Sequence, residues 1–352
     1  MNFGISNKGA EMNFSRSIRV ITQKDLISAG CLDFATAVGV CEKALREYAA
    51  GGVIFPDKVS VIFDEATQDR INCLPAGFSS QKVYGMKWVS VFPQNPIKNG
   101  VPNVSAVLLL SELNKGFPIA FIEGTMLSNI RTAAMSALAA KHLGKNGSED
   151  IGFIGSGEQA KSHFLAMKSI FGSLKRCRIS SASPVSNQYF ISQMARLCPD
   201  VEFVDCDCDY RRAVSSADII VTAISGQEPI LKADYIKDGA FYCHVGGYED
   251  EFAVAEKADK IVCDSWETVK HRTQTISRMY KQGLLKDSDI HANLHEIVIG
   301  MKPGRESPSE FIYYNGVGLS FIDVAIGKWA FDRVVSAGLG ENVLLQDKSM
   351  FD

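Results

Sequence analysis

Two basic residues stand where a buried side chain is expected. Lys87 interrupts the apolar run Tyr84–Val91, and Arg131 lies among small and apolar residues between Ile130 and Ala137. A lysine on an apolar strand can extend its ammonium group to solvent. An arginine on such a helix can form an interhelical salt bridge or a bidentate clamp on a carboxylate. Both side chains are therefore candidates for binding an acidic substrate, and both structural alternatives stay open.

A glycine-rich loop is the most specific chemical signal. An apolar strand from Ile151 leads into Gly-x-Gly-x-x-Ala, and a helix and a second strand follow, in the order of a dinucleotide-binding βαβ unit. Gly155 permits a tight turn, Gly157 lets backbone amides approach a pyrophosphate, and Ala160 allows close packing. The helix N-terminus favours phosphate. We expect cofactor contacts from Gly155, Ser156, Gly157, Glu158, Gln159 and Ala160.

The end of the second strand bears on which dinucleotide binds. NAD enzymes usually carry an acidic residue there that binds the ribose hydroxyls, whereas this chain has Ser181 and Ser183. Because no carboxylate would repel a 2′-phosphate, the sequence allows NAD or NADP and leans slightly to NADP through Ser181. The serines can instead simply cap the helix that follows.

The order of predicted elements places these residues in two domains. The first part of the chain has short apolar runs separated by turns, which favours a mostly antiparallel sheet. Strands and helices then alternate, which implies a parallel sheet covered on both faces. Helices at 125–143 and 320–337 should connect the two parts. We expect an α/β fold with a Rossmann-type doubly wound domain at 131–319 and an α+β domain built from both chain ends, 1–130 and 320–352.

Composition excludes several functional classes. The 352 residues are 46% hydrophobic and 22% charged with a net charge of −3, and they form no basic stripe that would bind nucleic acid. No run approaches the roughly 20 apolar residues of a membrane span, and the start lacks a signal-peptide core. We therefore expect a cytoplasmic protein with no membrane partner. Nine cysteines form no Cys-x-x-Cys pair, so we expect reduced thiols and no metal site.

Several motifs together resemble the ornithine cyclodeaminase and mu-crystallin family of NAD(P)-binding enzymes. The resemblance extends from about Val20 to Leu345 and implies that Lys87, Arg131 and Lys58 bind an amino-acid carboxylate. It also implies that Lys87 binds carboxylate or activates water, and that the first domain binds substrate and forms a homodimer. The matching segments are Gly85–Trp88, Phe92–Pro102, Arg131–Ala134, the glycine loop and Lys302–Arg305.

Further roles follow from this resemblance. Thr222, Ser225 and Val317 should line the nicotinamide pocket, both by resemblance and by position after the fourth strand of the parallel sheet. Independently of the resemblance, Asp323 stands at the start of the last helix, where it either orients a lysine or caps the helix. The cyclodeaminases have a catalytic aspartate directly after Val-Gly-Gly, where this chain has Tyr248. Ornithine cyclisation is thereby put in doubt. The next two residues, Glu249 and Asp250, are candidate catalytic replacements, although both can equally be surface acids at a turn.

One branch of the family is especially similar. Ile122–Gly124, Val262–Trp266 and Lys270-His271 resemble dehydrogenases that cleave N-(2-amino-2-carboxyethyl)-L-glutamate to 2,3-diaminopropionate and 2-oxoglutarate for siderophore or antibiotic biosynthesis. Ser181 departs from the staphylococcal type, which is acidic there. The alternatives are a ketimine or imine reductase, an alanine-dehydrogenase-like or ornithine-cyclodeaminase-like enzyme, or a crystallin-like protein that binds cofactor and a small ligand without turnover.

Overall fold

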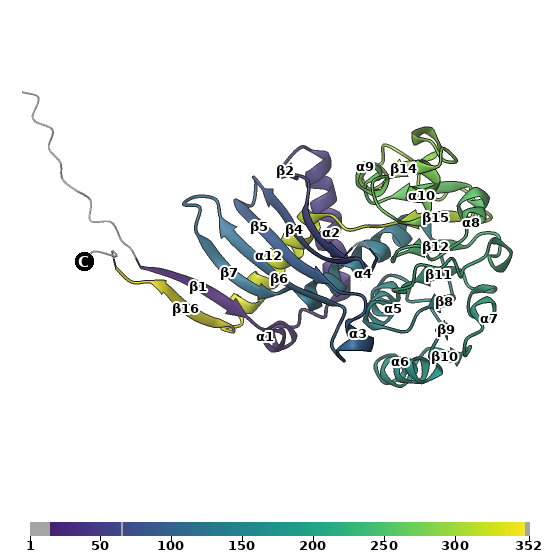
Figure 1. Ribbon diagram of the computed structural model, residues 1–352, viewed down its shortest axis with the longest axis horizontal. Coiled ribbons are helices and arrows are strands. Elements are labelled where there is room, and N and C mark those ends of the chain that lie inside the picture. The colour runs from purple at the N-terminus through teal and green to yellow at the C-terminus, as the bar shows by residue number, and fades with distance from the viewer. Residues whose placement is uncertain (1–14, 65, 349–352) are drawn as a thin grey trace, which may run out of the picture.

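Two β-sheets define the architecture of the computed structural model (Figure 1). The structure describes residues 15–64 and 66–348, so the ends of the expected first domain, 1–14 and 349–352, lie outside the described residues. One sheet is mixed and the other is parallel throughout. The expected fold class, a Rossmann-type sheet beside an α+β unit, is confirmed.

The mixed sheet joins both ends of the chain in the order β16-β1-β7-β6-β5-β4-β2, with β3 also paired to β4. Strands β4 to β7 are antiparallel neighbours, as predicted, whereas β1 pairs parallel with β7. The parallel pair arises because helices, instead of a hairpin, carry the chain away from β1. The strands are β1 (Arg16–Ile21), β2 (Val53–Ile54), β3 (Val59–Asp64), β4 (Asp69–Phe78), β5 (Val83–Val91), β6 (Val104–Glu112), β7 (Pro118–Glu123) and β16 (Glu341–Gln346).

Helices cover one face of the mixed sheet, and α12 lies across β4 to β7 (Figure 1). Side chains alternate between the two faces. Leu108 and Ile122 point to the helices and are 1% and 0% exposed, whereas Trp88 and Phe121 on the other face are 43% and 42% exposed. That outer face is therefore rich in accessible apolar groups. The helices of this part are α1 (Gln23–Ser28), α2 (Phe34–Ala49), α3 (Asn95–Lys98), α4 (Gly124–Leu143) and α12 (Ser320–Ser336).

The parallel sheet has the order β10-β9-β8-β11-β12-β15-β13-β14. Its strand order reverses between β8 and β11, and open sheets of this type bind ligands outside the carboxyl ends of the strands at such a reversal. The elements are β8 (Asp150–Ile154), α5 (Glu158–Ile170), β9 (Arg176–Ser180), α6 (Pro184–Leu197), β10 (Glu202–Asp205), α7 (Tyr210–Val214), β11 (Ile219–Thr222), β12 (Phe241–His244), α8 (Phe252–Lys257), β13 (Lys260–Cys263), α9 (Trp266–Val269), α10 (Thr275–Lys281), β14 (Ala292–Asn293), α11 (Leu294–Val298) and β15 (Ile312–Asn315), with 3₁₀ turns at Ala233–Tyr235 and Asp287–Asp289.

The helix α4 connects the two sheets. Glu123 caps it, since its carboxylate accepts hydrogen bonds from the Thr125 and Met126 amides at 2.6 and 3.0 Å. The helix packs against both α2 and α5, and its alanines allow this close approach from two sides. The expected domain division at residue 130 falls inside α4, and the division itself stays a prediction. Within 15–64 and 66–348, no helix combines the length and apolarity of a membrane span.

Candidate active site

One buried carboxylate joins the two basic side chains. Asp323 Oδ1 lies 2.6 Å from Lys87 Nζ and 2.9 Å from Arg131 Nε. The side chains of Lys87 and Asp323 are each 4% exposed, and that of Arg131 is 14% exposed. The structure thus brings three of the predicted site residues together, from β5, α4 and α12, and we call them the ionic cluster.

The pleat of the sheet and the start of α12 position this cluster. Lys87 pairs with Leu108 of β6, whose side chain is buried on the helix-covered face, and opposite residues of paired strands share a face. Asp323 lies in the first turn of α12. That turn is tied to β4, because the Ser320 hydroxyl donates a hydrogen bond to the Pro75 carbonyl at 2.8 Å. The lysine therefore points into the interior and meets its carboxylate there.

The electrostatics of the cluster suit proton transfer. Burial, together with the Arg131 charge, lowers the pKa of Lys87 to about 8 against the opposing effect of Asp323. A lysine tuned in this way can act as a general base near neutral pH. Asp323 Oδ2 is buried and has no hydrogen-bond partner among the described residues. The cluster therefore offers a proton acceptor at Lys87 and a free hydrogen-bond acceptor at Asp323.

A turn after β15 packs against Arg131. Gly318 has a φ of +86°, and a Cβ there would collide with the Arg131 guanidinium. Asp264, which directly follows β13, holds the turn, because its Oδ2 accepts hydrogen bonds from the Val317 and Gly318 amides at 2.9 and 2.7 Å. Burial raises the pKa of Asp264 to about 6. Val317 was predicted at the site, whereas Asp264 was missed; its signal is a carboxylate directly after a buried strand.

Lys58 lies beside this region but is not part of the ionic cluster. It is half-buried and precedes β3. Val59 pairs with Cys73 of β4, and Cys73 pairs in turn with Trp88 of β5. Lys58 therefore stands two strands away from Lys87, at nearly the same height in the sheet. Its role in binding substrate stays a prediction.

The glycine loop has the shape of a phosphate cradle. Gly155 has a φ of +105°, and a Cβ there would collide with the Ala223 carbonyl. Gly157 is the N-cap of α5, and the space where its Cβ would lie is open. No side chain among the described residues caps this helix. Its first amides are therefore available to a pyrophosphate, and the fully buried Ala160 allows the close packing expected of it.

The other predicted loop residues connect this cradle to its surroundings. Gln159 Nε2 donates a hydrogen bond to Asn129 Oδ1 of α4 at 2.7 Å. Glu158 is largely exposed and pairs with Lys161 at 2.7 Å. Ser156 Oγ donates to Ser181 Oγ at 3.0 Å. Asn129, which the sequence did not single out, thus links the cofactor loop to the helix that carries the arginine of the ionic cluster.

Neutral side chains stand at the end of β9. Ser181 is buried, and its hydroxyl donates a hydrogen bond to Asn187 Oδ1 at 2.6 Å. Ser183 is exposed and caps α6, since its Oγ accepts a hydrogen bond from the Ser186 amide at 3.3 Å. The capping alternative therefore holds for Ser183, while Ser181 supports the loop from inside.

Two predicted residues, Thr222 and Glu249, bind each other. Thr222 Oγ1 donates a hydrogen bond to Glu249 Oε2 at 2.7 Å. The Glu249 carboxylate also accepts hydrogen bonds from the Ile224 and Gly246 amides at 2.7 and 2.8 Å, and it is fully buried. It therefore ties together the loops after β11 and β12 and lies apart from the ionic cluster. Ser225 is exposed on the first of these loops.

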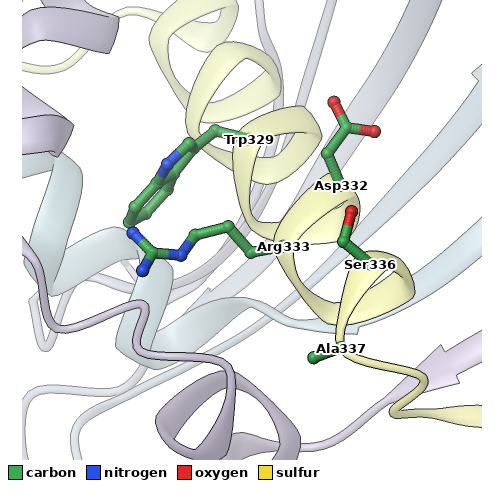
Figure 2. Close-up of a pocket in the computed structure, with 5 residues that line it drawn as sticks. All are labelled: Trp329, Asp332, Arg333, Ser336 and Ala337. Atoms are coloured by element: carbon green, nitrogen blue, oxygen red, sulfur yellow. The ribbon is translucent and has the colours of Figure 1, made fainter.

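A surface hollow at the far end of α12 is unrelated to this chemistry. Figure 2 shows the side chains that line it, and Arg333 there binds the Ala29 carbonyl and Asp33, both at 3.1 Å. Asp323 lies at the opposite end of the same helix. We therefore assign no functional site to the hollow. Its lining residues are Trp329, Asp332, Arg333, Ser336 and Ala337.

Comparison with known proteins places this geometry in a family. The model of the ornithine cyclodeaminase/mu-crystallin family matches residues 20–338. The chain is 26% identical to the N-((2S)-2-amino-2-carboxyethyl)-L-glutamate dehydrogenase of Staphylococcus aureus over 94% of this chain and 99% of that one. A Thermococcus litoralis Δ1-pyrroline-2-carboxylate reductase structure with NADH and L-proline aligns with a TM-score of 0.88 at 28% identity, covering 93% and 100% of the two chains. An archaeal alanine dehydrogenase dimer with bound NAD aligns at 0.84 and 29% identity, covering 93% and 99%.

The chain belongs to the ornithine cyclodeaminase/mu-crystallin family. Its expected class, an NAD(P)-dependent dehydrogenase, is confirmed by similarity to enzymes of that class along nearly the whole chain, with the ionic cluster and phosphate cradle in place. A bound dinucleotide would lie along Gly155–Gln159, and it would supply the hydride chemistry.

Proposed function

We propose that this enzyme oxidises a secondary amine derived from an amino acid, with N-(2-amino-2-carboxyethyl)-L-glutamate as its substrate. The ionic cluster carries the proposal, because it combines a guanidinium for a carboxylate with a lysine of lowered pKa. Similarity to the staphylococcal dehydrogenase supports this substrate. The products would be 2,3-diaminopropionate and 2-oxoglutarate, for siderophore or antibiotic biosynthesis.

Each residue of the cluster has a distinct role in this reaction. Arg131, with Lys58, would hold the substrate carboxylate while the Cα–H bond next to the amine gives its hydride to the nicotinamide of the bound dinucleotide and the nitrogen releases its proton to solvent. Water then attacks the resulting imine carbon, and Lys87 accepts a proton from that water. Lys87 returns that proton to the nitrogen, and the C–N bond breaks to release the amine and the keto acid. Asp323 orients Lys87 and keeps it near the reacting carbon.

Other residues have supporting roles in the proposal. Ser181 and Ser183 leave the ribose end of the cofactor site neutral, so the enzyme accepts NAD or NADP with a slight preference for NADP. Thr222, Ser225 and Val317 border the nicotinamide. Glu249 acts by fixing the loops after β11 and β12, since its carboxylate is fully engaged there.

The reduction of a cyclic imine is the second candidate function. The pyrroline-2-carboxylate reductase similarity favours it, because that structure aligns with 93% of this chain at 28% identity. Such a substrate carries one carboxylate, which Arg131 alone can hold. Product identification separates the candidates, since imine reduction gives a cyclic amino acid whereas amine cleavage gives an open-chain amine and a keto acid.

A screen of cofactor absorbance at 340 nm tests both candidates directly. Substrates would be the secondary-amine dicarboxylates, ornithine, alanine and cyclic imines, each with NAD(H) and NADP(H), and products would be identified by mass. Lys87→Ala and Arg131→Ala should abolish turnover while dinucleotide binding stays nearly unchanged. Lys98→Ala, an exposed lysine on α3, is the control. Equal loss of cofactor affinity in both site variants would contradict the assignment.

We also propose that the enzyme is a cytoplasmic homodimer. The outer face of the mixed sheet carries half-exposed apolar groups such as Trp88 and Phe121, and patches of this kind mark protein interfaces. Similarity to an alanine dehydrogenase dimer supports this state. Sedimentation velocity would give the mass of the particle.

A further inference from the structure

The segment between α9 and the 3₁₀ turn that begins at Asp287 is strongly basic. Between Glu267 and Asp287 the chain has five lysine and arginine residues and no acidic one. Lys270 is paired with both flanking acids, at 2.8 and 3.7 Å. Arg272 and Arg278, in contrast, have no ion pair within the described residues. This part of the molecule therefore carries two guanidinium groups whose charge is not balanced by the protein.

Arg272 lacks a partner although it has lost much of its contact with water. The side chain is half-buried, and burial lowers its pKa with no carboxylate to offset the effect. No side chain or carbonyl of the described residues accepts a hydrogen bond from its guanidinium. Desolvating a cation without pairing it is unfavourable, so such a residue is typical of a site that receives an anion.

Arg278 presents a second guanidinium beside Tyr248. Its Cζ lies 4.4 Å from the centre of the Tyr248 ring, and its Nε donates a hydrogen bond to the Thr273 carbonyl at 2.9 Å. Its two Nη groups have no acceptor in the described part of the chain. The aromatic ring and the Nε contact fix the plane of the guanidinium. The remaining donors are thus pre-oriented for a planar anion such as a carboxylate.

This segment lies at the ligand-binding edge of the parallel sheet. Gln274 Nε2 donates a hydrogen bond to the Gly246 carbonyl at 3.3 Å, and Thr275 Oγ1 donates to Asp250 Oδ1 at 2.7 Å. Gly246 belongs to the loop after β12, at the carboxyl end of that strand. Glu249 ties the same loop to the end of β11. The two arginines are therefore anchored where open α/β sheets bind their ligands.

The cofactor phosphates are out of reach of these arginines. The phosphate cradle follows β8, whereas the segment that carries the two arginines is anchored to the loop after β12, two steps away in the order β8-β11-β12. At about 4.8 Å a step the separation is about 10 Å, which is longer than an arginine side chain. The ribose end of the cofactor, at β9, lies farther still. The anion that fits is therefore part of the substrate.

We propose that Arg272 and Arg278, with Tyr248, form a second anion subsite that binds the distal carboxylate of a dicarboxylic or tricarboxylic amino-acid substrate. The inference rests on the proposed function, in which Arg131 and Lys58 hold the first carboxylate. It makes the enzyme selective for substrates with several carboxylates over those with one.

Calorimetric binding to the NAD(P)-loaded enzyme tests the subsite without requiring turnover. L-glutamate and L-alanine share an α-carboxylate and an amine, and only glutamate carries a distal carboxylate. Wild-type enzyme should bind glutamate more tightly. Because charge-assisted hydrogen bonds are lost, Arg272→Gln and Arg278→Gln should each weaken glutamate binding by about 10-fold or more. Alanine binding should change by less than about twofold, since alanine makes no such contact.

Two variants serve as controls. Arg196→Gln removes one positive charge from exposed α6 and should leave both affinities unchanged. Arg272→Lys keeps the charge and should restore part of the glutamate affinity. Equal binding of both amino acids by the wild type, or equal losses for both in the variants, would overturn the subsite. If the subsite variants behave as expected but no secondary amine is turned over, the proposed function fails and the subsite stands.

Discussion

Asp323 Oδ1 forms ion pairs with both Lys87 Nζ and Arg131 Nε, at 2.6 and 2.9 Å, although the three residues come from elements far apart in the chain. A single carboxylate oxygen thus pairs with both cations, and it opposes the lowering of the Lys87 pKa by burial and by Arg131. The following predictions begin from this arrangement.

Asp323→Asn should impair both stability and catalysis. Two buried cations would lose their partner, so the free energy of unfolding should fall by about 3 kcal/mol. The main influence that raises the Lys87 pKa would also be lost. Thermal denaturation and the pH dependence of kcat/KM measure the two effects. Asp332→Asn, at an exposed position on the same helix, is the control. An unchanged pH profile would rule out the ionic role of Asp323.

The pH profile of the wild type should report the Lys87 titration. As a base, Lys87 must be neutral, so kcat/KM for amine oxidation should rise with pH through about 8. In Lys87→Arg this rise of kcat/KM with pH should be absent. A fall above pH 8 would instead show that the charged lysine is required, as in carboxylate binding. The same shift affects stability: between pH 8 and 10.5 only the unfolded lysine retains its proton, so stability should rise with pH there.

Two glycines of the cradle should respond differently to alanine. At Gly155 the new Cβ would collide with the Ala223 carbonyl at a positive φ, so Gly155→Ala should lower the free energy of unfolding by about 1–3 kcal/mol. At Gly157 the space is open. Gly157→Ala should therefore fold normally but bind dinucleotide about 10-fold more weakly, because its methyl group lies where the phosphates approach. Fluorescence titration with NADH and NADPH, together with chemical denaturation, separates the two effects.

Ser183→Asp should change cofactor preference without disturbing the helix. Aspartate caps helices as well as serine does, so the melting temperature should stay within about 1 °C. Its charge would repel a 2′-phosphate, and the KM for NADPH should rise about 10-fold while that for NADH changes little. Ser183→Asn, a neutral cap, is the matched control. Equal changes for both cofactors would mean that this position does not face the ribose.

Phe121→Asp should dissociate the proposed dimer. The residue is 42% exposed on the outer face of β7, so the substitution would place a charge in the interface while it leaves the protomer core intact. Sedimentation velocity should show half the mass of the wild type. Val185→Asp, on exposed α6, should have no such effect. A wild-type monomer would refute the dimer at once.

Local patterns predicted much of the fold. The βαβ unit beginning at Ile151 follows from apolar strands, glycine spacing and helix periodicity, all of which are short-range signals. The strand Glu341–Gln346 escaped prediction because most of its residues are exposed and, within the described part of the chain, it pairs only with β1, from the other end of the chain. The parallel β1–β7 pair escaped for the same reason, since a pairing partner distant in sequence leaves no local pattern.

The site shows the same division between local and distant information. The position of Lys87 on a strand could be predicted, but its partner Asp323 is 236 residues away, and the place of Asp323 at a helix start left helix capping equally open. Glu249 is the converse case. Its side chain folds back to Thr222 and to two backbone amides, and nothing in the sequence around Tyr248 indicates that these donors converge on it.

The continuous helix α4 has a consequence for the order of events in catalysis. It carries Arg131 into the ionic cluster, and through Asn129 it also binds Gln159 beside the phosphate cradle. These two positions lie within a single turn of one rigid rod. A dinucleotide that binds to the glycine loop should therefore fix the position of Arg131 before the amine substrate binds. Steady-state kinetics should accordingly be sequential, with the cofactor binding first and leaving last.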